Sequence, residues 1–548
     1  MARIRTALIT ALLLAPLAFG GGASAAAAQD DKSLAELRNT VINLLQGLVE
    51  RGVLTREQAE TMVKNAQAKA ASDTAKEAAA AEAQEKAEAN AVRVPYVPEI
   101  VREQIRKEVA AELAPQVTDE VLKKAKADRW GVPGALPEWA KSVRLSGDVR
   151  VRTEDDLFAS DNARNLYYNI LNINDKGGIG KAGLAAFMNT TEDRFRVRER
   201  IRLGMDVDLA HGWSLGARLT TGNLRDAVST NQTLGNYGGR YQTQFDLGYL
   251  KWYTHSYSGR NALHLWAGRM PNPFVATTDL VWDSDLTFEG LAASYRLGLS
   301  RLTPYGRYLY LTAGAFPLQE VELSPKDKWL YGGQLGLDYA FDHGSRLRVN
   351  AGYYDYENVT GRMNALDSTL LDFTAPVFVQ RGNTLVDIRN DTDSSTNLFA
   401  LAAQYRLLNA SASFDWRLTP GYKLGLAADW VRNVGYDAGR VAALLGRVVP
   451  PRVTGYQAEI AFGSASLAQA RAWRALFGYR YVQRDAVLDA FTDSDFHLGG
   501  TDAQGYYFGA DYSFTPHVGL RLRYLSANEI DGPPLGIDIW QIDLTGQF

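Results

Sequence analysis

The chain has 548 residues, and its 59 basic side chains nearly balance its 62 acidic ones, which gives a formal net charge of −3. This balance gives no reason to expect nucleic acid or another polyanion as a partner. Cysteine is absent, so the composition excludes disulfide frameworks and thiolate metal sites. A soluble chain of this length would usually contain several domains.

The first residues have the features of a secretory signal peptide, assigned to residues 1–25. Two arginines near the start are followed by a short apolar run (7–19) and by the small residues of GGASAAAAQD. Cleavage is expected after Ala25 or Ala28. A membrane-spanning helix needs about 20 apolar residues, and no later segment has an uncharged apolar run of that length. The sequence therefore predicts an exported protein without a transmembrane helix.

Residues 26–135 are predicted to be helical and coiled-coil-like. Capping-box patterns open helices at 33–36 (SLAE) and 55–58 (TREQ), and residues 66–91 are mostly Ala, Glu, Lys and Gln. A narrow apolar stripe at 101–113 suits a partner helix better than a core of its own, so the chain could form a homo-oligomer through this region. The alternative is a solvated spacer with marginal helices.

Residues 136–548 alternate between apolar and polar side chains with a period of two, as in VRLSGDVRV (143–151) and HVGLRLRY (517–524). Short turns such as FDHGS separate some of these segments, and long polar loops separate others. The clearest long loops are residues 154–192, 222–240, 358–395 and 484–503. Alternating short and long connections are typical of an outer-membrane barrel, because its short turns all lie on one side of the membrane. We therefore predict an all-β transmembrane β-barrel preceded by an α-helical region.

The number of strands must be even if the chain enters the first strand and leaves the last strand on the periplasmic side. Treating residues 398–418 as one long strand gives about 16 antiparallel strands. Eighteen strands are the alternative, with a further hairpin hidden in residues 358–418. Residues 358–395 are either an outer loop or a constriction that folds into the pore.

The last nine residues, WQIDLTGQF, form an alternating segment that ends in an aromatic side chain. Its apolar face includes Ile542, Leu544 and Phe548. Such an ending resembles the assembly signal of outer-membrane β-barrels. Together with the signal peptide, it predicts location in the cell outer membrane, with outer-membrane lipid and the barrel assembly machinery as partners.

Several longer segments carry a family resemblance. They are LVERGVLTREQAETMVKNAQ, VRVPYVPEIVREQIRKEV, GALPEWAKSVRLSGDVRVRTE, GRMPNPFVATTDLVWDSDLTFEGLAASY and YRYVQRDAVLDAFTDSDFHLGGTDAQGYYFGADYSF. In these segments, which extend from about residue 48 to 515, the chain resembles the putative porin family of Gram-negative outer membranes. The resemblance implies a channel-forming barrel with a periplasmic N-terminal helical extension, and it does not identify a solute.

One segment, RFRVRERIRLGMDVDL (194–209), has five arginines at alternate positions. In a strand all five share one face, and arginine on the lipid face at mid-membrane costs roughly 2–4 kcal/mol, so this face is expected to line the pore. The expected pore-lining residues are Arg194, Arg196, Arg198, Arg200, Arg202, Arg144, Arg150, Arg152, Arg218, Arg346 and Arg348. An excess of arginine on the pore wall favours anions. The alternative is that inward-facing aspartates pair with these arginines and leave little field.

Other side chains that could carry chemistry have simpler explanations. Two DSD motifs, 283–285 and 493–495, are expected to lie outside the barrel, and they lack the spacing of an EF-hand calcium loop. His497 lies among polar loop residues, and loop polarity explains it better than catalysis. We therefore expect no catalytic, cofactor-binding or metal site, and no enzymatic activity.

Two functions remain after these exclusions. The first is an outer-membrane porin, a passive water-filled channel for small hydrophilic solutes with an anion bias. The second is a structural outer-membrane anchor whose helical region tethers a periplasmic partner. A steady conductance in a planar bilayer would distinguish them.

Overall fold

The computed structural model describes residues 138–548, apart from residues 257–260, 300–305, 323 and 394. The expected signal peptide (1–25) and helical region (26–135) lie outside the described residues. No helix in the described part of the chain is both long and apolar enough to cross a membrane. The first described element is the short helix α5 (Glu138–Lys141), which leads directly into the first strand.

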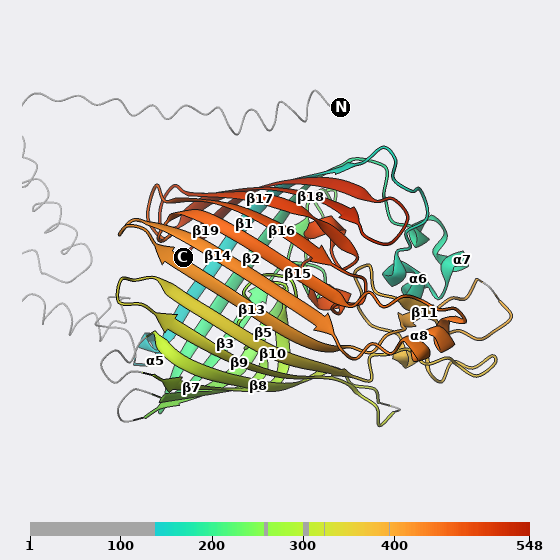
Figure 1. The fold of residues 1–548 in the computed structure, drawn as a ribbon, viewed down its shortest axis with the longest axis horizontal. Coiled ribbons are helices and arrows are strands. Elements are labelled where there is room, and N and C mark those ends of the chain that lie inside the picture. The colour runs from blue at the N-terminus through green and yellow to red at the C-terminus, as the bar shows by residue number, and fades with distance from the viewer. Residues whose placement is uncertain (1–137, 257–260, 300–305, 323, 394) are drawn as a thin grey trace, which may run out of the picture. The chain divides into compact units, whose positions relative to one another are not determined.

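The described chain forms one closed antiparallel barrel (Figure 1). Its sheet has 17 strands, one of which is the two-residue β4 (Gln232–Thr233) beside β2, so 16 long strands make up the barrel. The prediction of 16 antiparallel strands is therefore confirmed, and the alternative of 18 is wrong. The long strands are β1 (Val143–Phe158), β2 (Arg194–Ala210), β3 (Trp213–Thr220), β5 (Gln244–His255), β6 (Asn261–Pro271), β7 (Thr287–Gly298), β8 (Arg307–Gln319), β9 (Lys328–Ala340), β10 (Arg346–Glu357), β13 (Arg406–Arg417), β14 (Tyr422–Asn433), β15 (Thr454–Ser464), β16 (Trp473–Val482), β17 (Ala503–Ser513), β18 (Val518–Glu529) and β19 (Gly536–Gln547).

Connections at the two ends of the barrel differ in length. One end, the short-turn end, carries tight turns such as 211–212 and 514–517 together with α5 and the C-terminus (Figure 1). The other end, the long-loop end, carries the long connections. The elements in those connections are α6 (Ile170–Lys176), α7 (Ile179–Ala182), η1 (Gly183–Ala186), η2 (Asp372–Thr374), β11 (Leu385–Asp387), β12 (Phe399–Leu401), α8 (Ala438–Leu445), η3 (Asp489–Phe491) and η4 (Phe496–Leu498).

Residues 398–418 do not form one strand. The structure divides them into β12, which pairs with β11 in a separate two-stranded sheet, and β13, which belongs to the barrel. A hairpin is therefore present in residues 358–418, but it lies outside the barrel sheet and adds nothing to the strand count. Most residues between β12 and β13 are buried, and a side-chain hydrogen bond holds them in place: the Tyr405 hydroxyl donates to Asp485 at 3.0 Å.

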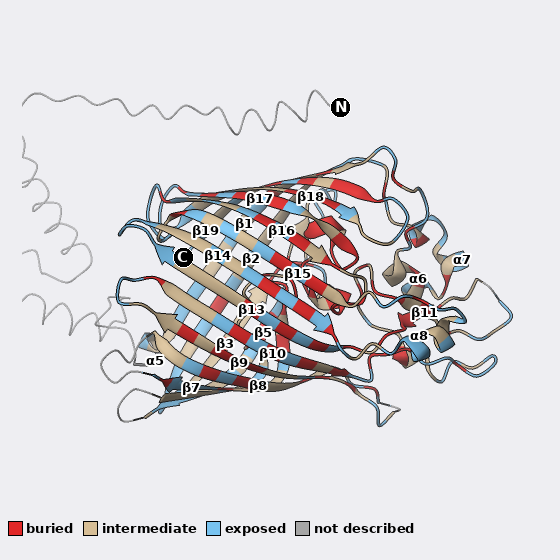
Figure 2. Ribbon diagram, in the orientation of Figure 1, coloured by how far each residue is buried: buried red, intermediate tan, exposed pale blue. Residues whose placement is uncertain are grey.

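Successive residues of each strand alternate between the outer and inner faces (Figure 2). On β2 the apolar side chains Ile201, Leu203 and Met205 are exposed on the outside of the barrel. The arginines between them face the interior, where they contact loop carboxylates. An apolar outer face and a charged inner face are what a strand between lipid and a polar lumen requires.

Three connections of the long-loop end turn back into the barrel. They are residues 272–286 between β6 and β7, 376–386 before and within β11, and 483–502 between β16 and β17. Phe274 and Trp282 of the first connection pack with Phe288, Phe316 and Tyr354 of the barrel wall. The DSD motifs, expected outside the barrel, belong to the first and third of these connections and lie inside it.

The C-terminal residue closes the seam between β19 and β1. Phe548 donates to the carbonyl of Gly147 at 3.0 Å, and the Gly147 amide donates to the carbonyl of Phe548 at 3.2 Å. A Cβ added at Gly147 would lie 2.7 Å from Cε1 of the Phe548 ring, so the ring packs directly on the glycine. The proposed role of Phe548, Leu544 and Ile542 in assembly remains a prediction.

The final strand offers a direct test of which residues face lipid. Leu544 is exposed on the outer face opposite Val151, near the middle of β1, whereas Thr545 faces inward. Leu544→Arg should lower the free energy of unfolding by roughly 2–4 kcal/mol. Gln547→Arg, on the same inner face as Thr545 and opposite Asp148, should lower it by less than about 1 kcal/mol. Urea unfolding in lipid vesicles measures both changes, and equal losses would contradict this assignment of faces.

Candidate functional site

The arginines of β2 form a ladder along one inner wall of the barrel, and carboxylates of β1 lie beside both ends of it. Arg196 pairs with Glu154 and with Asp156, the latter at 2.9 Å. Arg202 pairs with Asp148 at 2.7 Å. These pairs lie between two adjacent strands, so the wall is internally cross-linked at both ends of the ladder.

Like charges meet in the middle of the ladder. The register between β1 and β2 sets Arg150 opposite Arg200 and Arg152 opposite Arg198, and we call these four side chains the arginine cluster. Like charges directly opposite in neighbouring strands repel each other, so the cluster needs carboxylates from elsewhere. β19 supplies one of them, since Asp543 accepts from Arg152 Nε at 2.6 Å.

The two inward-folded DSD motifs supply further carboxylates to this wall. Asp285, from residues 272–286, lies 3.3 Å from Arg200 and 3.4 Å from Arg202. Asp495, from residues 483–502, lies 2.9 Å from Arg152 and 3.0 Å from Arg523. Each loop carboxylate thus bridges two arginines of the wall. Both motifs were expected outside the barrel, and that expectation is wrong, because their carboxylates bind arginines of the inner wall.

Arg480 of β16 fixes the two inward-folded connections to each other. Its guanidinium is buried and donates to Thr492 Oγ1 at 2.6 Å, to Asp493 at 3.3 Å and to the backbone oxygen of Asp279 at 3.3 Å. Thr492 Oγ1 in turn donates to the backbone oxygen of Leu280 at 2.8 Å. Residues 272–286 and 483–502 therefore form one bonded unit inside the barrel.

Of the remaining arginines expected in the pore, Arg144, Arg346 and Arg348 lie near the short-turn end, whereas Arg218 lies toward the other end of β3. Arg218 pairs with Asp246 at 2.6 Å, and Arg144 lies opposite Asp206 in the register of β1 and β2. Arg346 and Arg348 both bind Asp338, at 2.6 and 3.2 Å.

Two arginines also share one carboxylate on β16–β18, where Arg474 and Arg521 bind Asp511 at 2.7 and 2.6 Å. The arginines at these shared sites reach further into solvent than the carboxylates they bind. The side chains of Arg346 and Arg348 are each 38% exposed against 5% for Asp338, and that of Arg521 is 46% exposed against 8% for Asp511. At these two sites the wall therefore presents guanidinium groups to water and covers the acids, whereas near the same end Asp206 is exposed and the Asp415 side chain is 41% exposed.

Three cavities follow the ladder from one end to the other. A cavity of about 380 Å³ on the long-loop side is lined by Arg194, Arg196 and Arg198. A second, of about 220 Å³, lies at the arginine cluster, and a third, of about 350 Å³, reaches Arg521 and Thr545 near the short-turn end. Asp495 lines the first and second cavities, so it lies where these two adjoin.

Residues 376–386 close part of the long-loop mouth. Gln380 Nε2 donates to the backbone oxygens of Asp489 and Thr492 at 2.7 and 2.8 Å, and Asn383 Nδ2 donates to that of Val487 at 2.9 Å. Of the two roles open to residues 358–395, the structure supports that of a constriction for the part near Gln380.

His497 has a structural environment. It is fully buried, its Nδ1 faces the guanidinium of Arg381, and its Nε2 lies 2.9 Å from the backbone oxygen of Leu535. Burial, with the nearby Arg381 cation, holds the pKa of His497 well below its usual range. A buried neutral imidazole with both nitrogens occupied joins the loop to the β18–β19 connection.

Within the described residues, no group of three or more His, Asp or Glu side chains is arranged to hold a metal ion.

Comparisons with known proteins give one family match and several similar solved structures. A family model described as a putative porin matches residues 38–548, and a comparison with curated proteins finds no match. Among solved structures, the chain is similar to OprB of Pseudomonas putida at high pH, with a TM-score of 0.42 and 11% identity over 75% of this chain and 95% of that chain. It is also similar to the outer membrane channel DcaP of Acinetobacter baumannii, with a TM-score of 0.38 and 11% identity over 74% of this chain and 97% of that one.

The bridging role of Asp495 can be tested by removing its charge. Asp495→Asn removes the carboxylate that pairs with both Arg523 and Arg152. Loss of this largely buried counter-charge should lower the free energy of unfolding by about 3–5 kcal/mol. Asp175→Asn is the matched control, because its pair with Arg225 is exposed and should contribute less than about 1 kcal/mol. Urea unfolding of both variants measures the difference, and a loss for Asp495→Asn no larger than for the control would contradict the bridge.

The buried Asp489 of η3 predicts a dependence of stability on pH. Burial raises its pKa to about 7 from an ordinary value of 3.8, so above about pH 4 the unfolded chain releases a proton that the folded chain retains. Stability contributed by this group is therefore lost as pH rises from about 4 to 7, by roughly 1 kcal/mol per pH unit. In Asp489→Asn that slope should disappear from unfolding curves measured across this range. Parallel pH profiles for the variant and the unchanged protein would show that Asp489 does not titrate in this way.

Proposed function

Because the chain belongs to the putative porin family, we propose that its barrel is a passive, water-filled pore for small hydrophilic solutes. We also propose that this pore prefers anions. Membership of the family implies an outer-membrane channel, and in such barrels the short turns face the periplasm. The short-turn end and the N-terminal region (26–135) would then both lie on the periplasmic side.

One observation carries the proposed anion preference: two arginines share one carboxylate at Asp338 and again at Asp511. Each of these sites keeps a net positive charge, since one carboxylate neutralises only one guanidinium. Both sites lie near the short-turn end, and at both the exposed groups are guanidiniums. Fixed charge of one sign on a pore wall raises the local concentration of counter-ions and favours their passage.

The arginine cluster acts differently from these two sites. Its charges are largely balanced by five carboxylates, so it forms a polar passage with strong local fields and little net charge. These are Asp148, Glu154, Asp285, Asp495 and Asp543. A solute that passes it exchanges water for guanidinium and carboxylate groups on opposite sides. Guanidinium forks suit carboxylate or phosphate groups on such a solute. We propose that the shared-carboxylate sites concentrate anions and that the cluster limits the size of what passes.

Replacing one arginine at each shared site tests the preference. The double substitution Arg348→Gln and Arg521→Gln removes two charges and leaves the pairs Arg346–Asp338 and Arg474–Asp511 intact. Under a salt gradient, the reversal potential should move toward cation preference. The movement should shrink between about 0.1 and 1 M KCl, because the screening length falls from about 10 to about 3 Å.

Arg164→Gln serves as the control for this measurement. Arg164 pairs with Glu192 in an exposed loop, and its side chain is 68% exposed. Its removal should leave the reversal potential unchanged. A cation-selective unchanged protein, or a double variant whose reversal potential equals that of the control, would contradict the anion preference.

A further inference from the structure

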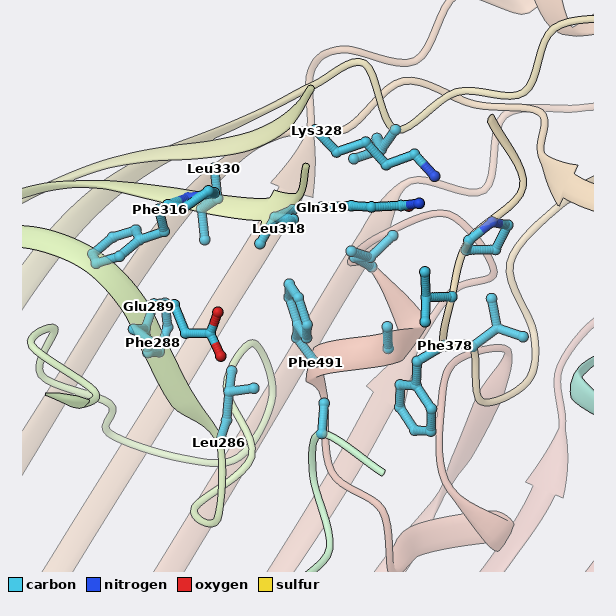
Figure 3. A pocket seen from close by; sticks show the side chains of 18 of the residues that line it. Leu286, Phe288, Glu289, Phe316, Leu318, Gln319, Lys328, Leu330, Phe378 and Phe491 are labelled. Atoms are coloured by element: carbon cyan, nitrogen blue, oxygen red, sulfur yellow. The ribbon is translucent and has the colours of Figure 1, made fainter. Parts of the chain in front are cut away.

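A fourth, largely apolar cavity adjoins the one at the long-loop side of the arginine ladder, since Phe378 and Val379 line both. It has a volume of about 350 Å³ and is bounded by the inner faces of β7, β8 and β9 and by residues from the inward-folded connections (Figure 3). Its wall is mainly aromatic and aliphatic: Leu286, Phe288, Phe316, Leu330, Phe378 and Phe491 line it. A cavity of this size with a few polar groups in an apolar wall has the usual character of a small-molecule site.

Lys328 is the unusual residue of this cavity. Its side chain is almost completely buried (5% exposed), and its ammonium donates to the backbone oxygen of Ala375 at 2.7 Å. That bond uses one of three donors, and no carboxylate in the described part of the chain pairs with it. A buried ammonium without a counter-charge is unfavourable, because its hydration is lost and nothing replaces it.

Gln319 provides a second incompletely bonded group at the same edge. It is the register partner of Lys328 across β8 and β9, and its side-chain oxygen is buried without a hydrogen-bond partner. The two side chains extend side by side in the view of Figure 3, with the rings of Phe378 and Phe491 across the cavity from them. The cavity thus has one polar edge, which carries a positive charge, and apolar walls.

The other charged side chains at the cavity already have bonding partners. The Asp226 carboxylate accepts from the backbone amides of Val228 and Ser229 at 3.1 and 3.0 Å. Arg269 and Glu289 pair with each other at 2.7 Å, and both side chains are substantially exposed. Arg225 pairs with Asp175 in an exposed position. The rim is therefore neutralised and open to water, and the charge that lacks a partner is the ammonium of Lys328.

We propose that this cavity binds an amphipathic monocarboxylate. The carboxylate accepts a hydrogen bond from the Lys328 ammonium, and the apolar body packs among Phe288, Phe316 and Phe491. The unpartnered Gln319 oxygen is itself an acceptor, so it adds polarity to this edge and does not bond the carboxylate. An uncharged apolar molecule would leave the ammonium without a counter-charge. A phosphate or a dicarboxylate would bring a second negative charge into a wall that has no further unpaired cation among the described residues. The assignment deepens the proposed channel function, because it names a class of solute that the barrel retains near its long-loop mouth.

The probes for the experiment are 3-phenylpropionate and its uncharged amide, which share one apolar body. Titration calorimetry on the purified full chain in detergent should show the acid binding at least about tenfold more tightly than the amide, since only the acid compensates the charge. Lys328→Gln should lower the affinity for the acid about tenfold and leave that for the amide unchanged. Lys328→Arg should restore the preference for the acid.

Lys326→Gln is the matched control, because Lys326 is exposed two residues away and does not line the cavity. Equal affinity of the unchanged protein for acid and amide, or no binding of the acid, would overturn the proposal without any variant. A Lys328→Gln protein that loses acid and amide equally would show that Lys328 only holds the loop at Ala375, which also overturns it. Conductance in KCl is recorded separately: a protein that conducts but does not bind the acid contradicts the pocket alone, and one that binds but does not conduct contradicts the channel alone.

Discussion

The repulsion between two cross-strand pairs of arginines is the constraint on which the interior of this barrel depends. Arg150 faces Arg200, and Arg152 faces Arg198, in the middle of the β1–β2 ladder. These side chains cannot turn to the lipid face, where each would cost several kcal/mol. They remain inside only because carboxylates reach them. Asp148, Glu154 and Asp543 come from the strands, and Asp285 and Asp495 come from loops.

The positions of the inward-folded connections follow from this charge balance. Residues 272–286 and 483–502 each bring a carboxylate to the ladder, and Arg480 fixes them to each other. Their apolar residues then pack on the part of the wall formed by β7, β8 and β9. The lumen is divided as a result into a charged route along β1 and β2 and an apolar region that contains the Lys328 cavity. Packing and ion pairing thus act together to narrow the barrel without filling it.

Strand periodicity was sufficient to predict much of this structure. A period of two assigns the inner and outer faces of β2. An even number of strands follows if the first strand begins and the last strand ends on the same side of the membrane. The loops could not be predicted in the same way, because no period links Asp285 or Asp495 to a face. A polar motif such as DSD is as typical of a solvent-exposed loop as of carboxylates that pair with buried arginines. The opposition of Arg150 to Arg200 was hidden as well, since it depends on the register between two strands separated by a long connection. The prediction of one strand over residues 398–418 was wrong for a related reason. Their apolar residues belong to the β11–β12 hairpin, to a buried loop and only then to β13.

Single-channel recording of the purified full chain in a planar lipid bilayer shows whether the barrel conducts. If the inward-folded connections narrow the lumen and leave an aqueous route along the arginine ladder, where three cavities follow one another, ions should cross it. We expect a steady open level whose size increases with KCl concentration. An absence of any steady open level, in a preparation shown to be folded and inserted, would mean that the loops close the barrel, and would favour a structural anchor over a channel.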